Sequence, residues 1–408
     1  MRRKSSVTII FFTVFLDLLG FGIVLPLMPL YALDPRFAAS PAQIGWLMAI
    51  YSIMQFFFAP LWGRYSDRVG RRPVLIIGLF GSSISYLVYG LAGSLTMLFV
   101  GRALAGVMGA NISVAQAAMA DITSQKDRAK AMGMIGAAFG LGFILGPAMG
   151  GLLSQYGLAT APLVAAVITG LNGIAALFLL AETRNPEHHN GDQPEPVAYH
   201  PLAPSRWKAV AEYGNVLVIC LLMGLFIAMF SAFEVVLPLW GNEFMGWTMT
   251  DIGWVFVYVG VVAVIVQGGI IRRLTPKIGE KLTTTLGLFL VAVGLMLLAQ
   301  MGKDWVWLSL AFIAAGSGFV HPGFSSLVSI NSDADKQGMM LGLFQSMSAL
   351  GRGVGPVMGG IVYGSHKGGV LFVAAIGVGV VLLLFLLVGR KIKNACQIET
   401  PAVKPTHP

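Results

Sequence analysis

The stretch Gly146-Pro147-Ala148-Met149-Gly150-Gly151 returns 209 positions later as Gly355-Pro356-Val357-Met358-Gly359-Gly360. Both copies lie inside apolar segments long enough to cross a bilayer as one helix. Because chance rarely keeps a register across half a chain, we predict a doubled membrane unit of the kind found in transporters. The other pairs in this register, at offsets of 209 or 208, are Gly133 and Gly342, Pro29 and Pro238, Gly70 and Gly279, and Ile44-Gly45-Trp46 and Ile252-Gly253-Trp254.

The composition places the chain in a lipid bilayer. Of its 408 residues 56% are hydrophobic and 11% are charged, and the mean hydropathy is +0.78. Such values exclude a water-soluble domain of this length. The 51 glycines favour close packing between membrane helices. The net charge is +9, and the Lys and Arg residues that produce it lie mostly in short loops, where they orient a membrane protein. We therefore expect no nucleic-acid partner.

Hydropathy predicts twelve spans of about 20 residues each. Six precede the longest polar stretch and six follow it. The chain therefore divides into a six-helix bundle at 1–181, a cytoplasmic linker at 182–213, a second bundle at 214–390 and a cytoplasmic tail at 391–408. The predicted spans are 7–31, 43–63, 73–93, 95–118, 131–154, 161–181, 215–240, 251–271, 281–301, 304–328, 337–362 and 368–389.

Histidine and cysteine residues give no sign of a metal site. His188 and His189 stand in the predicted linker among charged residues and prolines, without further ligands at a suitable spacing. We read them as part of a solvated connection. Cys220 lies in an apolar span and Cys396 in the tail, so we expect no disulfide, no metal and no cofactor.

The charge distribution predicts the orientation in the membrane. Met1-Arg2-Arg3-Lys4 precedes an apolar run that contains Asp17 and has no small-residue cleavage site, which indicates an uncleaved first span. Most of the 27 Lys and Arg residues fall on the side that carries both termini, while Arg36, Lys303 and Lys367 fall on the other. This bias predicts a multi-pass protein of the cell (inner) membrane with both termini in the cytoplasm.

The loop between the second and third spans carries a motif. It reads Gly63-Arg64-Tyr65-Ser66-Asp67-Arg68-Val69-Gly70-Arg71-Arg72-Pro73. Orientation by positive charge explains the arginines but not the acid or the two spaced glycines. The loop resembles the signature G-x-x-x-D-R-x-G-R-R/K of the major facilitator superfamily at Gly63, Asp67, Arg68, Gly70, Arg71 and Arg72.

This resemblance implies an all-α fold of twelve transmembrane helices in two pseudo-symmetric six-helix bundles that work by alternating access. It implies that the loop is a cytoplasmic gate, with Asp67 against the N-terminus of the eleventh span in the closed state, where a helix dipole favours a carboxylate. Asp121, at the end of the fourth span, is assigned to the same gating motif. Pro276 stands at the position equivalent to Asp67 in the second half, so we expect the two halves to be functionally unequal.

The fourth span contains an arginine. By resemblance Arg102 and Gly106 belong to a second superfamily motif. An arginine inside a span is costly and normally faces a cavity or a partner. Arg102, Gly109, Ser113 and Gln116 share one helix face, which favours a cavity. Snorkelling of Arg102 to the outer headgroups is the alternative.

Glycines recur four residues apart in the fifth span. Such spacing by itself indicates close helix packing with a proline kink. The run Gly142-x3-Gly146-Pro147-x2-Gly150-Gly151 resembles the motif that the superfamily associates with antiporters, and this resemblance therefore favours export. The residues of this motif are Gly142, Gly146, Pro147, Gly150 and Gly151.

The first half further resembles the tetracycline-efflux group of drug:proton antiporters. The resemblance rests on Leu16 to Gly22 with Pro26 and Pro29, on Ala59 to Gly63, on Ala120 to Thr123 and on the fifth-span motif. It makes Asp17 the first-helix aspartate of that group, about 15 Å into the membrane. A low dielectric favours the neutral carboxyl, so Asp17 could load and release protons, with Arg102 acting in the opposite sense. A purely structural pairing of the two remains open.

The chain departs from that group in its other acids. Ser85 stands where the group has a third-helix aspartate, and the ninth span lacks an acid, so a metal-chelated tetracycline is not the expected substrate. Glu234 in the seventh span could bind cationic drugs, couple protons or mark the outer rim. Arg352, with Ser348 and Gln345 on its helix face, could pair with Glu234 or bind an anion. His321 before Pro322 marks a helix break or a proton relay.

These observations predict a monomeric secondary transporter rather than an enzyme, because no phosphate-binding loop or catalytic constellation is present in the sequence. We expect a proton-coupled antiporter that exports amphipathic drugs, with protons and a small molecule as its partners. Proton coupling is assigned to Asp17, Glu234 and Arg102, and the substrate cavity to Ser113, Gln116, Gln345 and Arg352. The alternatives are a symporter or facilitator for nutrient uptake and a transport-inactive sensor or scaffold.

Overall fold

A computed structural model describes residues 2–109, 111–123, 125–183, 214–333, 337–389 and 392. Every regular element within these ranges is a helix. Most of the predicted linker 182–213, including His188 and His189, lies outside the described residues, as does almost all of the tail 391–408.

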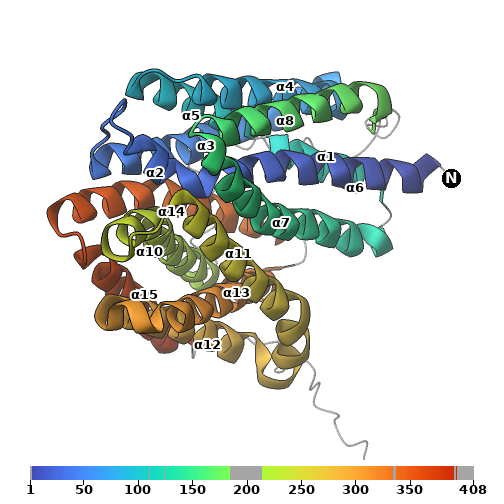
Figure 1. The fold of residues 1–408 in the computed structure, drawn as a ribbon. Coiled ribbons are helices and arrows are strands. Elements are labelled where there is room, and N and C mark those ends of the chain that lie inside the picture. Colours follow the sequence, from blue (N-terminus) through green and yellow to red (C-terminus); the bar gives the residue numbers. More distant parts are fainter. Residues whose placement is uncertain are drawn as a thin grey trace, which may run out of the picture. The chain divides into compact units, whose positions relative to one another are not determined.

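Within each half of the chain the helices follow one another with short connections (Figure 1). Those of the first half are α1 (Arg2–Val24), α2 (Met28–Ala32), α3 (Pro41–Val69), α4 (Arg71–Gly90), α5 (Leu95–Gly109), α6 (Asn111–Asp121), α7 (Gln125–Leu153) and α8 (Thr160–Leu179). Those of the second half are α10 (Gly214–Met245), α11 (Met249–Ile265), α12 (Ile271–Met301), α13 (Val306–Ile330), α14 (Gln337–Ser365) and α15 (Gly369–Gly389).

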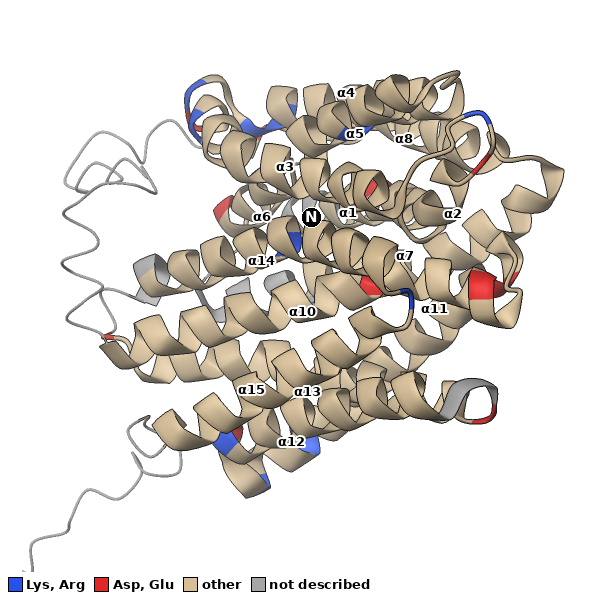
Figure 2. Cartoon of the chain, turned by 90° about the vertical axis from the view of Figure 1, so that its left-hand side faces the viewer, with Lys and Arg blue, Asp and Glu red and all other residues tan. Residues whose placement is uncertain are grey.

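Ten helical runs in the described part of the chain are long and apolar enough to cross a membrane. One of them, Met249–Gln300, is 52 residues long and contains two predicted spans, 251–271 and 281–301. A π-helical turn at Val266–Ile270 and a left-handed backbone at Gly279 (φ 80°) break it between them. The predicted span 337–362 corresponds to α14, which is helical but not among the ten. Charged residues lie mostly near helix ends and in loops (Figure 2).

Local signals set the ends of α3. Ser40 accepts a hydrogen bond from the backbone N–H of Gln43, the Gln43 side chain accepts one from the backbone N–H of Ser40, and Pro41 occupies the first helical turn. This capping box satisfies N–H groups that the helix cannot pair internally. At the other end Gly70 adopts φ 104°, a conformation that glycine accepts without steric cost. The helix therefore stops at Val69, and α4 begins at Arg71.

The chain packs into two compact units. The first contains Met1–Pro201 together with Ser231–Val261 and Arg352–Val370. In it α1 packs against α7 and α8, and α4 packs against α5 and α8 (Figure 1). The second contains Leu202–Phe230, Val262–Gly351 and Leu371–Pro408, with α12 against α13. Parts of α10, α11 and α14 thus belong to the first unit, whereas the predicted bundles 1–181 and 214–390 follow the sequence repeat.

The core of the first unit is built from α1, α4, α6, α7 and α8. Leu18, Leu79 and Met119 are at most 2% exposed within it. Asn172 on α8 donates to the carbonyl oxygen of Thr13 on α1 at 2.8 Å, so a buried polar side chain is satisfied by backbone. The helix that carries Asp17 is therefore fixed on several sides.

The sequence repeat is also a repeat of contacts. A Cβ at Gly150 would lie 2.3 Å from the carbonyl oxygen of Ile23, and a Cβ at Gly359, 209 positions later, would lie 2.9 Å from that of Ala232, also 209 positions later. The two copies of the motif therefore press against the same place on equivalent helices, α1 and α10. Only glycine permits so close a backbone approach.

Candidate functional site

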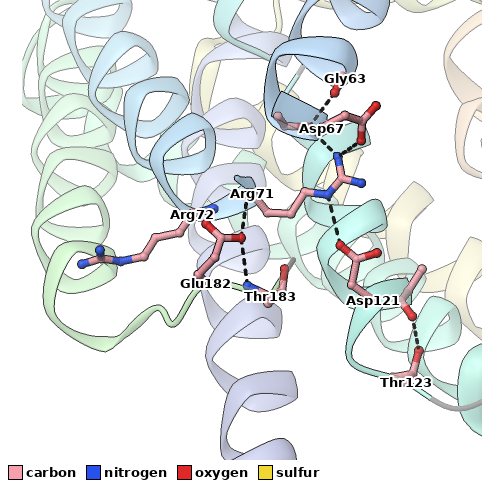
Figure 3. Close-up of polar contacts among 10 residues, drawn as sticks. Gly63, Asp67, Arg71, Arg72, Asp121, Thr123, Glu182 and Thr183 are labelled. Atoms are coloured by element: carbon pink, nitrogen blue, oxygen red, sulfur yellow. Dashed lines mark hydrogen bonds and ion pairs between the residues drawn. The ribbon is translucent and has the colours of Figure 1, made fainter. Parts of the chain in front are cut away.

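The hairpin between α3 and α4 is organised around Arg71. Its guanidinium lies 2.6 Å from an oxygen of Asp67 and 3.1 Å from one of Asp121, and it donates to the Ser66 hydroxyl at 2.6 Å (Figure 3). The Ser66 hydroxyl in turn donates to the carbonyl oxygen of Gly63 at 2.7 Å. Four positions of the predicted gating motif, Gly63, Asp67, Arg71 and Asp121, thus join in one network that links the end of α3 to the end of α6.

The remaining positions of the motif have separate surroundings. Arg68 is exposed, and Gly70 is buried at the turn. Arg72 points away from the network and donates to the carbonyl oxygen of Leu177 on α8 at 2.6 Å. The backbone N–H groups of Arg71 and Arg72 both donate to the carboxylate of Glu182. Sequence reasoning did not assign Glu182 to this site, because it treated Glu182 only as an acid of the linker.

A second group of polar residues surrounds Tyr51 on α3. The Arg102 guanidinium lies 4.7 Å from the centre of the Tyr51 ring, and Arg102 is 3% exposed. Its side chain also reaches the carbonyl oxygen of Leu47 at 3.4 Å. A buried guanidinium over an aromatic face gains a cation–π attraction. Arg102 therefore lies buried among packed helices in the described part of the chain.

Tyr51 also lies close to three charged residues of the membrane region. Asp17, Arg102 and Arg352 are all within electrostatic range of its hydroxyl. The Tyr51 ring packs on Phe21, one turn beyond Asp17 in α1, with 5.1 Å between the ring centres. Among the described residues no ion pair links Asp17 to Arg102, so the two side chains are not paired in this conformation.

Two glycines of α5 make room for Tyr51. A Cβ at Gly106 would lie 2.4 Å from the Tyr51 carbonyl oxygen, and one at Gly109 would lie 2.3 Å from its hydroxyl oxygen. Gln55 donates to the carbonyl oxygen of Gly109 at 3.1 Å. Sequence reasoning assigned Gly109 to a polar stripe and missed Tyr51. The available signal was the pair of glycines on the facing helix.

The antiporter-type motif of α7 packs along α1. Cβ atoms at Gly142 and Gly146 would lie 3.0 Å and 2.6 Å from backbone atoms of Leu18 and Gly22 respectively. Leu18 directly follows Asp17. Gly151 faces another helix, α11, where its Cβ would lie 3.1 Å from the Cα atom of Gly253. The motif therefore sets the distance between α7 and the helix that carries Asp17.

The other residues that the sequence analysis singled out differ in burial. Ser113, Gln116 and Gln345 are exposed, which is compatible with a cavity face, whereas Ser348 is buried and donates to the carbonyl oxygen of Phe344 at 2.9 Å. Glu234 and Arg352 are half-buried and within electrostatic range of each other, without an ion pair between them. His321 packs edge-on against Phe344 with 5.4 Å between the ring centres.

Comparison with known proteins identifies the family. The profile of the Major Facilitator Superfamily matches residues 10–356. The chain belongs to the Major Facilitator Superfamily. As a member of this superfamily it is a multi-pass membrane transporter and not an enzyme.

Members of the superfamily that resemble the chain include named resistance proteins. The class C tetracycline resistance protein of Escherichia coli is 33% identical over 369 residues, which cover 89% of this chain and 91% of the relative. Multidrug resistance protein 2 of Bacillus subtilis (strain 168) is 29% identical over 89% of this chain and 90% of the relative. The similarity thus extends over both halves of the chain.

A solved structure of the superfamily has the same fold. The crystal structure of the human organic anion transporter MFSD10 (TETRAN) matches with a TM-score of 0.72 and 26% identity, and covers 95% of this chain and 100% of that one. Among the described residues, no cluster of three or more His, Cys, Asp or Glu side chains is arranged to hold a metal ion. The major facilitator fold predicted from the sequence is confirmed.

Proposed function

We propose that the chain is a proton-coupled antiporter that exports amphipathic drugs or related small molecules by alternating access. The observation that carries the proposal is the packing of Asp17. Its helix is held against an antiporter-type glycine motif at Leu18 and Gly22, in a family whose similar members are named for tetracycline and multidrug resistance. A carboxyl group in this low-dielectric position favours its neutral form and gains a proton readily.

The arrangement around Tyr51 supports coupling between proton and substrate. The Arg102 guanidinium lies over the ring of Tyr51, and Asp17 lies within electrostatic range of the Tyr51 hydroxyl. Ionisation of Asp17 would draw the guanidinium toward α1, whereas the neutral acid leaves it on the aromatic face. In this proposal the charge on Asp17 therefore selects between two positions of Arg102, and the position of Arg102 differs between the two states of the transport cycle.

We place the protein in the bacterial inner membrane as a monomer surrounded by lipid. Twelve spans form the two six-helix bundles, 1–181 and 214–390, and both termini face the cytoplasm. The substrates we propose are neutral or cationic amphipathic compounds rather than metal-chelated tetracycline. Ser85 occupies the place of the third-helix aspartate, is 1% exposed and donates to the carbonyl oxygen of Gly81, so it offers no charge to a metal complex.

Proton flux in proteoliposomes tests this proposal. Ethidium or magnesium-bound tetracycline is added to vesicles that contain a pH-sensitive dye, and the substrate-dependent proton flux is measured for the wild type and for Asp17→Asn. We expect ethidium to drive flux that Asp17→Asn abolishes. The matched control is Asp34→Asn, the same chemical change in the loop between α2 and α3, which should leave the flux intact. Equal flux in wild type and Asp17→Asn would remove Asp17 from the mechanism.

A second candidate function is uptake of a small organic anion. It is favoured by two arginines in the membrane region, Arg102 and Arg352, both within electrostatic range of Tyr51, and by the similarity to the structure of the human organic anion transporter MFSD10 (TETRAN). Inward accumulation of a labelled organic acid along the proton gradient, lost in Arg352→Gln, would decide for uptake. The absence of any substrate-dependent proton flux would instead favour a transport-inactive sensor.

A further inference from the structure

The N-terminus of α4 is capped from a distant part of the chain. Gly70 stands at the capping position and has no side chain to accept the free N–H groups of the first turn. Glu182 takes this role, since the N–H groups of Arg71 and Arg72 donate to its two oxygens at 2.9 and 3.1 Å (Figure 3). The cap is separated from the helix by more than 100 residues, and a negative charge there also suits the positive end of the helix dipole.

Gly70 has two separate reasons to be glycine. Its φ of 104° strains any residue that has a side chain. In addition, a Cβ at this position would lie 2.3 Å from a carboxylate oxygen of Glu182. A side chain at position 70 would therefore displace the capping carboxylate of Glu182, and Gly70 leaves room for it.

Arg72 makes the reverse contact. It leaves the first turn of α4 and donates to the carbonyl oxygen of Leu177 at 2.6 Å. Leu177 lies in the last turn of α8, where carbonyl groups have no partner in their own helix and a positive charge is favourable. Arg72 in the first turn of α4 thus contacts the end of α8, while Glu182, three residues after α8 ends, caps the start of α4.

We propose that Glu182 is a positioning residue of the cytoplasmic gate. It fixes the backbone of Arg71, while the Arg71 side chain reaches Asp67 and Asp121. Loss of the cap releases the backbone of Arg71. The contacts of the Arg71 side chain with Asp67 and Asp121 then lose their geometry, although all three residues are still present. Glu182 is also the first residue of the predicted linker 182–213, so the linker begins at a residue that contacts the gate.

A spin label in the hairpin tests the proposal without any substrate. Val69 is 45% exposed beside Gly70, so Val69→Cys in a Cys396→Ser background accepts a nitroxide label, while Cys220 is buried. We expect a more mobile label in Glu182→Gln and a still more mobile one in Glu182→Ala. The control is Glu187→Gln, which removes the same charge five positions later. An unchanged label in Glu182→Ala, or the same gain in mobility in Glu187→Gln, would overturn the proposal.

Transport kinetics separate positioning from substrate binding. This arm rests on the proposed function and uses ethidium as the probe. Because the gate acts on a conformational step, Glu182→Ala should lower the maximal rate about fivefold, the effect of losing a typical helix cap, with KM unchanged. A raised KM at an unchanged rate would refute positioning. If the wild type itself moves no ethidium, the proposed function fails for this probe, while the label still decides the role of Glu182.

Discussion

The packing of α7 on α1 predicts a large effect of one methyl group at Gly146. A Cβ there would lie 2.6 Å from both the Cα atom and the carbonyl carbon of Gly22, whereas carbon atoms in contact are about 3.5–4.0 Å apart. Both neighbours are backbone and cannot rotate away. Gly146→Ala must therefore move α1 and α7 apart by about 1 Å, the difference between these distances.

The cost can be estimated and measured. Overpacking of this kind destabilises a protein by about 1–3 kcal/mol, and the displaced helix carries Asp17. We expect Gly146→Ala to lower the midpoint of thermal unfolding in detergent and to reduce ethidium-driven proton flux at least tenfold, since shifts of about 1 Å at a working site have effects of this order. The midpoint is read from fluorescence during heating, and the flux from reconstituted vesicles.

A matched substitution in the same helix provides the control. A Cβ at Gly136 would meet no atom within 4 Å, and alanine is the better helix former by about 1 kcal/mol. Gly136→Ala should therefore leave flux unchanged and keep or raise the midpoint. If Gly146→Ala behaves like Gly136→Ala, the close approach of α7 and α1 is not a feature of the working protein, and the reasoning from the glycine motif is refuted.

Three further predictions follow from other contacts. Tyr51→Leu removes the aromatic face under Arg102 and should reduce proton flux severalfold, whereas Tyr51→Phe keeps the face and should retain most of it, as the vesicle assay measures. Gly45→Ala places a Cβ 2.3 Å from the carbonyl oxygen of Pro356, and Gly253→Ala places one 2.6 Å from that of Pro147. Both substitutions should therefore increase the rate at which maleimide labels Gln155→Cys at that end of the helices. A faster rate in only one of the two variants would contradict the pseudo-symmetry. The side chain and backbone N–H of Arg36 donate to Asp34 and hold the pKa of Asp34 below its usual value. The ionised Asp34 carboxylate therefore contributes its full stabilisation above about pH 4 and loses it as the pH falls through the lowered pKa. Acid unfolding curves of Asp34→Asn should differ from those of the wild type above that pH and converge with them below.

Hydropathy predicted helical segments that the structure contains, because the membrane imposes one length and one chemistry on each span. It placed the ends of α3 and α4 less well. The predicted span 43–63 corresponds to a helix at Pro41–Val69, since backbone hydrogen bonding continues past the point where the side chains become polar. The conformation of Gly70 determines where α3 ends, and hydropathy carries no information about backbone conformation.

The motif residues were found because spacing along one helix carries their signal. Tyr51 and Glu182 were not. Tyr51 is one of ten tyrosines and in an apolar span looks like any core aromatic residue; only the rotation of α3 brings it under Arg102. Glu182 acts through backbone groups more than 100 positions away, and the residues it contacts would present the same N–H groups whatever their side chains.

The repeat and the chemistry of this protein are distributed differently. Glycine contacts recur in both halves, at Gly150 with Ile23 and at Gly359 with Ala232. The charges do not recur: the positions 209 residues after Asp17 and Arg102 hold Phe226 and Ala311. Close backbone packing must be equivalent in the two halves if their helices are to move in equivalent ways, and glycine is the residue that permits it. A buried charge is costly in a membrane and is needed only where a proton or substrate binds, so the two halves share their packing while the first half alone carries the Asp17 and Arg102 pair.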